Sequence, residues 1–106
     1  MVQVKVLVAD QLSADGLKLL TAEPGLQVDV KTGLSPAELA QIVGLYEGLI
    51  VRSSTKVTAE VIQKADRLKV IGRAGVGLDN VDADAATQRG IIVMHAAIMS
   101  ASGGRR

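Results

Sequence analysis

The stretch Val4-Lys5-Val6-Leu7-Val8-Ala9-Asp10 shows the pattern that the rest of the chain repeats. It is a short apolar run rich in β-branched residues, which is typical of a buried strand, and it ends at an acidic residue. Similar apolar runs occupy residues 26–31, 48–51, 68–71 and 91–94. These runs, with the first over residues 4–9, predict a sheet of five strands.

The intervals between these runs have the features of amphipathic helices, namely a residue that can cap the amino end and apolar residues at helical spacing. The predicted caps are Ser13, Ser35 with Pro36 at the first helical position, and Thr58, and a further helix is expected over residues 82–89. We expect the following side chains to form the apolar faces of the helices: Leu17, Leu19, Leu20, Leu39, Ile42, Val43, Leu45, Val61 and Ile62.

Strands joined by helical crossovers run parallel and are covered on both faces, so the pattern predicts an α/β fold. Right-handed crossovers and one reversal of winding favour a flavodoxin-like, doubly wound sheet with the order 2-1-3-4-5. A complete sheet of this type has a closing helix after its last strand. Residues 98–106 contain Gly103-Gly104 and two arginines, which is a poor helix interior, so we expect this final helix to be missing.

An uncovered apolar sheet face favours association, so the chain is expected to form a homodimer or a domain-swapped oligomer. We divide it into a truncated domain over residues 1–94 and a divergent tail over residues 95–106. A frameshifted terminus, a deliberate truncation and a natural isolated domain all fit this pattern.

Composition narrows the classes of partner. The chain has 106 residues, 48% of them hydrophobic, and a formal net charge of +1, which predicts one folded domain without a strong field for nucleic acid or an anionic membrane. One tyrosine is the only aromatic residue, so there is no platform for base stacking. The absence of cysteine and of a long apolar span predicts a cytoplasmic protein without disulfides.

Ligands of doubly wound sheets bind at the carboxyl ends of the strands, which selects Asp10, Lys31, residues 52–55, residues 73–77 and His95 as site candidates. No cysteine, metal-ligand spacing or nucleophile signature accompanies them. A lone histidine is more often structural than catalytic, so His95 is not assigned a catalytic role.

Arg52 and Arg73 follow neighbouring strands of the predicted sheet and can form a clamp for phosphate or carboxylate. Ser53 adds a hydroxyl, and the loop Gly75-Val76-Gly77 adds backbone amides that an anion can approach. The alternative is that the arginines pair with surface carboxylates and that the glycines simply allow a turn. The same loop is no dinucleotide fingerprint, because Asn80 stands at the third glycine position and the loop does not follow the first strand.

Two long runs resemble the phosphoglycerate dehydrogenases within the D-isomer-specific 2-hydroxyacid dehydrogenase family. They are Glu47-Gly48-Leu49-Ile50-Val51-Arg52-Ser53-Ser54-Thr55-Lys56-Val57-Thr58 and Gly72-Arg73-Ala74-Gly75-Val76-Gly77-Leu78-Asp79-Asn80-Val81-Asp82. The resemblance covers about residues 4–94 and corresponds to the amino-terminal part of the substrate-binding domain.

In that family, NAD-dependent oxidation of 3-phosphoglycerate begins serine biosynthesis. The resemblance implies that Arg52 and Arg73 hold the anionic substrate with Ser53 nearby, while the amides at Val76 and Gly77 receive its carboxylate. The family's NAD fingerprint and catalytic residues lie in a following domain. We therefore expect this chain to bind a 3-phosphoglycerate-like anion weakly, to hold no cofactor alone and to be inactive alone.

Two alternatives remain open. The chain can act as an interaction module that self-associates through its uncovered sheet face, or as a small regulatory domain that binds phosphorylated hydroxy acids.

Overall fold

The strands form one parallel sheet in the order β2-β1-β3-β4-β5, as the sequence predicts. The computed structural model describes residues 3–11, 14–52, 55–73 and 80–95. Its elements are β1 (Val4–Val8), α1 (Ala14–Thr21), β2 (Leu26–Val30), α2 (Pro36–Ile42), the 3-10 turn η1 (Val43–Leu45), β3 (Gly48–Val51), α3 (Ala59–Gln63), β4 (Val70–Arg73), α4 (Ala83–Gln88) and β5 (Ile92–His95).

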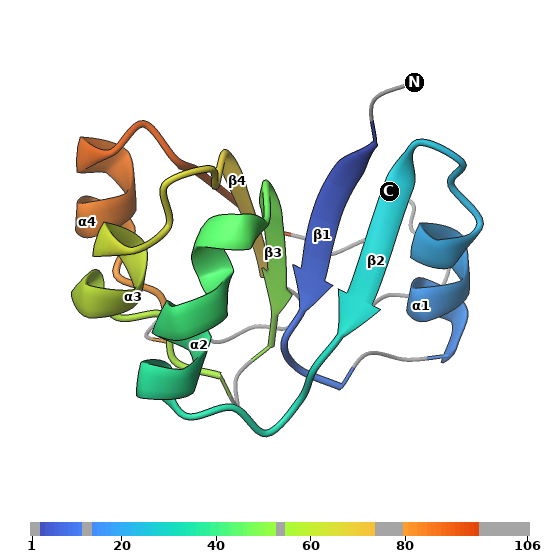
Figure 1. Ribbon diagram of the computed structural model, residues 1–106, viewed down its shortest axis with the longest axis horizontal. Coiled ribbons are helices and arrows are strands. Elements are labelled where there is room, and N and C mark those ends of the chain that lie inside the picture. The colour runs from blue at the N-terminus through green and yellow to red at the C-terminus, as the bar shows by residue number, and fades with distance from the viewer. Residues whose placement is uncertain (1–2, 12–13, 53–54, 74–79, 96–106) are drawn as a thin grey trace.

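Helices cover the two sides of the sheet unequally (Figure 1): α2, α3 and α4 lie on one side and α1 lies on the other. The larger core lies under the three helices, where Leu7, Leu49 and Ile71 form a row across β1, β3 and β4. Leu39 of α2 and Val61 of α3 pack against this row, and all five side chains are almost completely buried. This face accounts for most of the buried apolar side chains of the described residues.

The opposite face of the sheet carries a smaller core. Val6, Val8 and Ile50 are buried there, with Leu20 of α1 packed against them. Towards β5 this face becomes exposed: the side chains of Ile92 and Met94 are 62% and 55% exposed. An exposed apolar strip on this face agrees with the predicted incomplete covering, but the absence of a closing helix concerns residues outside the described part of the chain.

Several predicted boundaries are wrong by one or two residues. The fourth strand was expected over residues 68–71 but is Val70–Arg73, and the fifth was expected over residues 91–94 but is Ile92–His95. Leu68 and Ile91 are buried although they precede their strands. The apolar pattern reports burial, whereas the strand is defined by its hydrogen-bond ladder.

The predicted helix faces are partly wrong. The second helix ends at Ile42 and continues as the 3-10 turn η1, so Leu45 turns outwards with 55% exposure. Leu19 is 64% exposed, because α1 directs Leu20 rather than Leu19 into the smaller core. A short helix with three leucines offers more than one apolar stripe, and packing selects among them.

Local capping confirms where two helices begin. The Ser35 side chain accepts a hydrogen bond from the Glu38 backbone N–H, and the Glu38 carboxylate accepts one from the Ser35 N–H, which completes a capping box with Pro36 at the first helical position. Hydrogen bonding of the Glu38 carboxylate to Ser35, first to its backbone N–H and then to its side chain, lowers the pKa of Glu38 from its ordinary value. The Thr58 side chain likewise caps α3 by accepting a hydrogen bond from the Val61 N–H, whereas Ser13 lies outside the described residues.

None of the described helices is long and apolar enough to cross a membrane.

Tyr46 ties β2 to the segment that enters β3. Its hydroxyl donates a hydrogen bond of 2.7 Å to the Asp29 carboxylate, and its ring is buried. Burial, reinforced by the hydrogen bond and charge of Asp29, raises the pKa of Tyr46 to about 12. The ring also packs under Lys5, whose Nζ lies 5.2 Å from the ring centroid.

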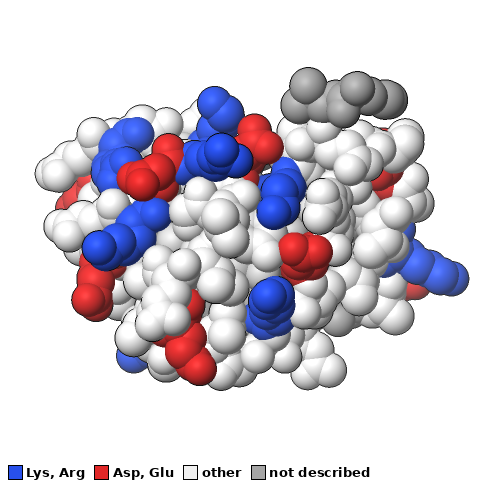
Figure 2. Space-filling view, viewed as in Figure 1, with Lys and Arg blue, Asp and Glu red and all other residues white. Residues whose placement is uncertain are grey.

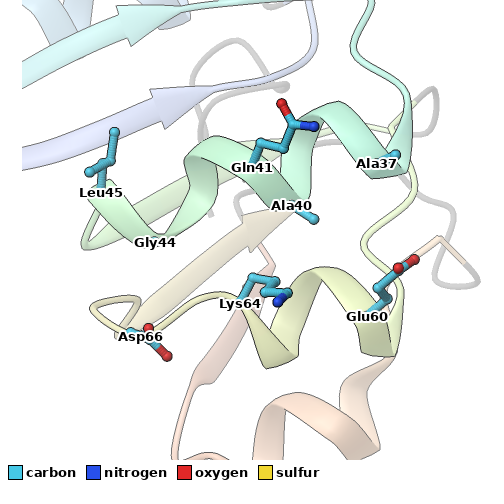
Figure 3. A pocket seen from close by; sticks show the side chains of 8 residues that line it. All are labelled: Ala37, Ala40, Gln41, Gly44, Leu45, Glu60, Lys64 and Asp66. Carbon is cyan, nitrogen blue, oxygen red and sulfur yellow. The ribbon is translucent and has the colours of Figure 1, made fainter.

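Helix α2 and the turn η1 approach α3 closely along a groove of about 630 Å³ (Figure 3). The figure shows Ala37 and Ala40 on α2, Glu60 on α3 and Lys64 at the carboxyl end of α3. At one end of this groove, a Cβ atom on Gly44 would lie 2.7 Å from the backbone carbonyl oxygen of Lys64. Glycine is therefore needed at this position so that the two segments can pack.

We expect Gly44→Ala to lower the free energy of unfolding by about 1–3 kcal/mol, because the new methyl group must displace backbone rather than a flexible side chain. The measurement is urea unfolding followed by circular dichroism. Gly25→Ala is the matched control, since nothing lies within 4 Å of a Cβ built there and the backbone φ of Gly25 is not positive. Equal stability of the two variants would contradict the close approach.

Candidate functional site

The strand order brings Arg52 and Arg73 to neighbouring strand ends. Arg52 directly follows β3, and Arg73 is the last residue of β4, paired with Val51 of β3. The expectation that Arg73 lies in the loop after the strand is therefore wrong, because the ladder with β3 extends to it. The prediction that both arginines lie at the same edge of the sheet is confirmed.

Asp10 organises the segment that follows β3. It is buried, with 5% exposure, and its Oδ2 accepts hydrogen bonds from the backbone N–H groups of Arg52 at 2.6 Å and Thr55 at 3.0 Å. The Thr55 hydroxyl lies 2.7 Å from the other carboxylate oxygen and 3.0 Å from the carbonyl oxygen of Ala9. Buried carboxylates need such donors, so Asp10 serves to anchor this segment.

Asn80 joins the same segment to β4. Its side-chain NH₂ group donates to the backbone carbonyl oxygens of Arg52 and of Thr55, the latter at 2.8 Å. Its Oδ1 accepts a hydrogen bond of 3.3 Å from Nε of Arg73. Asn80 therefore contacts both arginine-bearing segments at once.

Sequence reasoning missed this role, since it considered Asn80 only as the residue that breaks a glycine fingerprint. The partners of Asn80 lie 7, 25 and 28 residues away in the chain. No local spacing rule connects positions so far apart, and the contact arises only after β3 and β4 have paired.

The two arginines differ in environment. Arg52 has an exposed side chain, whose Nη1 donates to the carbonyl oxygen of Gln11 at 3.2 Å. Arg73 is only 5% exposed. Within the described ranges the one ion pair joins Arg89 to Asp66, so Arg73 has no carboxylate partner among those residues. A buried guanidinium is costly unless an anion or polar groups compensate its charge.

Among the other candidates, Lys31 lies apart from the two arginines, whereas the backbone of His95 lies beside Arg73. Lys31 follows β2, beyond β1 from the two arginines, and its side chain is exposed. Asp82 caps α4 by accepting a hydrogen bond from the Ala85 N–H at 3.0 Å. The backbone of His95 pairs with that of Arg73 at the end of β5. Ser53 and the loop Gly75-Val76-Gly77 lie outside the described residues.

Other hollows and charges lie away from this edge. A pocket of about 510 Å³ sits at the amino ends of the strands, between Lys5, Glu47 and Lys69. The described residues contain no group of three carboxylate or histidine side chains that could hold a metal ion. On the face shown in Figure 2, basic and acidic side chains are interspersed rather than separated by sign. Long-range charge therefore does not select a binding region on this face, and local geometry at the strand ends has to do so.

The five-stranded parallel sheet with helices on both sides defines a doubly wound α/β domain, and two arginines lie at its carboxyl edge. The chain belongs to the D-isomer specific 2-hydroxyacid dehydrogenase family, since the model of that family's catalytic domain matches residues 6–103. This confirms the family resemblance inferred from the two quoted runs.

Relatives with similar sequences are D-3-phosphoglycerate dehydrogenases. That of Archaeoglobus fulgidus is 56% identical over 92 residues, which are 87% of this chain and 17% of the relative. The human protein of the same name is 54% identical over 91 residues, or 86% of this chain and 17% of the relative. The chain thus spans about a sixth of the length of the curated relatives it matches.

Solved structures agree on the fold. The PH0520 protein of Pyrococcus horikoshii matches with a TM-score of 0.82 and 35% identity over 91% of this chain and 28% of its own. The NAD+-bound 3-phosphoglycerate dehydrogenase of Entamoeba histolytica matches with a TM-score of 0.78 and 27% identity, over 88% of this chain and 32% of its own.

Replacing Thr55 with valine should lower the free energy of unfolding by about 1–3 kcal/mol, because the Asp10 carboxylate then keeps a buried oxygen without its donor. Thr55→Ser retains the hydroxyl and should cost clearly less. Urea unfolding at neutral pH measures both. If valine and serine destabilise the chain equally, the Asp10 contact does not hold the segment.

Proposed function

We propose that this chain is the substrate-recognition part of an NAD-dependent phosphoglycerate dehydrogenase, and that Arg52 and Arg73 hold the phosphate and carboxylate groups of a small hydroxy acid such as 3-phosphoglycerate. Ser53 and the amides of the loop Gly75-Val76-Gly77 complete the proposed site.

One observation carries this proposal above the others. Arg73 is buried at the carboxyl end of β4 and, within the described ranges, has no carboxylate partner. Its neighbour Arg52 presents a second guanidinium from the adjacent strand end, and planar guanidinium groups match phosphate and carboxylate oxygens well. The names of the sequence relatives support 3-phosphoglycerate as the anion.

The residues of this chain do not fit NAD itself. A dinucleotide needs glycines after the first strand, but the residues after β1 are Ala9, Asp10 and Gln11. Residue 31, after β2, is a lysine rather than the acidic residue that binds the ribose. We therefore propose that NAD binds elsewhere in the parent enzymes and that this chain alone transfers no hydride.

We also propose that the parent enzyme acts in serine biosynthesis and that the chain is cytoplasmic. This proposal is supported by the family membership and by the composition of the chain.

Titration with 3-phosphoglycerate should shift amide NMR signals at the carboxyl ends of β3 and β4, with a dissociation constant in the millimolar range, on the order of 1 mM, because one wall of a cleft offers few contacts. The double variant Arg52→Ala, Arg73→Ala should lose these shifts. Arg67→Ala, which removes an exposed arginine at the amino ends of the strands, should bind as the unmodified chain does.

A folded double variant that still binds at these positions would contradict the proposed site. NADH formation by the purified chain with NAD and 3-phosphoglycerate would contradict the proposed inactivity.

A second candidate function is self-association through the exposed side of the sheet. The register places Gly48, Val70 and Ile92 in one row, and Ile50, Gly72 and Met94 in the next. Both rows are apolar throughout, and both end in an exposed side chain on β5. A second copy of the chain can bury this strip, and this burial favours a homodimer or a domain-swapped oligomer.

If the strip is the contact, Ile92→Lys should shift the solution mass measured by light scattering towards the monomer, because a charge at a dry interface is costly. Leu19→Lys is the matched control, since Leu19 is equally exposed, at 64% against 62%, but lies on α1. A mass that is the same in both variants would rule the strip out as the contact.

A further inference from the structure

Asn80 has an environment that defines the orientation of its amide. The two neighbours of its NH₂ group are carbonyl oxygens, those of Arg52 and Thr55, and the neighbour of its Oδ1 is the Nε–H of Arg73. Only one orientation of the amide satisfies all three partners. An aspartate in the same place could accept from Arg73 but would set an oxygen against two carbonyl oxygens.

The backbone of Asn80 is held independently of its side chain. Its carbonyl oxygen accepts a hydrogen bond of 2.7 Å from the Val57 N–H, and the Asp82 N–H donates to the Val57 carbonyl oxygen at 2.9 Å. These bonds form a short parallel bridge between Val57 and Val81. The side-chain amide is therefore presented from a fixed position, and replacing it leaves this bridge in place.

The contact with Arg73 uses one particular atom of the guanidinium. Nε donates to Asn80. The terminal Nη1 and Nη2 atoms have no hydrogen-bond or ion-pair partner within the described part of the chain. A hydrogen bond at Nε restricts rotation of the planar group and thereby sets the direction of the terminal N–H fork. The same amide also holds the backbone from which Arg52 projects.

We infer that Asn80 is a positioning residue that sets the two arginines relative to each other for an anion carrying phosphate and carboxylate groups. This inference rests on the proposed function and adds a residue that does not itself touch the anion. Asp10 anchors the Arg52 segment from the β1 side and Asn80 from the β4 side, but only Asn80 also contacts Arg73. Asn80 is thus the link through which the spacing of the two arginines is controlled.

The test compares Asn80→Asp and Asn80→Ala with the unmodified chain by NMR titration with 3-phosphoglycerate. Asn80→Asp should weaken binding about tenfold or more, because its carboxylate competes with the anion for Arg73 and repels it, and one charge-assisted contact has about this value. Asn80→Ala should weaken binding less and should also remove the protection of the Arg73 Nε–H against exchange with water. Gln27→Glu, with the same change of charge on β2, is the control and should bind normally.

The outcomes separate the two proposals. If the unmodified chain shows no binding, the proposed function fails and this inference fails with it. If the unmodified chain binds and folded Asn80→Asp and Asn80→Ala variants bind equally well, the proposed function stands and the positioning role is overturned. Urea unfolding of each variant corrects the affinity for any unfolded fraction, and Asn80→Ala decides the matter if Asn80→Asp does not fold.

Discussion

Strand β3 is buried along its whole length, between β1 on one side and β4 on the other, with helices on one face and a smaller apolar cluster on the other. Its first residue is closely packed, because a Cβ atom on Gly48 would lie 3.3 Å from a methyl group of Val6. Strand β3 pairs in parallel with β1 on one side and with β4 on the other. The remaining elements can be understood as the covering and the continuation of β3.

The candidate site depends on the same strand. Where β3 ends, the chain passes between two polar side chains, Asp10 from the end of β1 and Asn80 from the segment before α4. Their hydrogen bonds compensate the backbone groups that leave the sheet ladder, so the segment carrying Arg52 keeps a defined path. Arg73 ends the adjacent strand and brings a buried positive charge to the same edge. The proposed anion site is thus a consequence of how the sheet ends and needs no separate scaffold.

Helices cover the two faces of the sheet unequally. Three helices and the row of Leu7, Leu49 and Ile71 make the larger core, whereas α1 alone accompanies the other face and lies over β1 and β2. This leaves Ile92 and Met94 exposed on β5. The apolar side chains on both faces are typical of a parallel sheet that is meant to be covered twice. The proposed self-association and the proposed anion binding therefore concern different regions of the molecule and do not exclude each other.

The class of fold, the number of strands, their order and the family can all be predicted from the amino-acid sequence. The fold class and strand order follow from local signals, since apolar runs alternate with capped amphipathic segments and helical crossovers enforce parallel pairing. The family follows from the resemblance carried by residues 47–58 and 72–82. The sequence also selected Arg52 and Arg73, because side chains after parallel strands meet at one edge. The tertiary structure alone decided that Arg73 lies within its strand and is buried, that Leu19 and Leu45 face outwards, that Asp10 is an anchor, and that Asn80 links the two arginines. The physical reason is that hydrogen-bond registers and contacts between distant segments depend on how the strands pair and pack, which periodicity along a single chain does not encode.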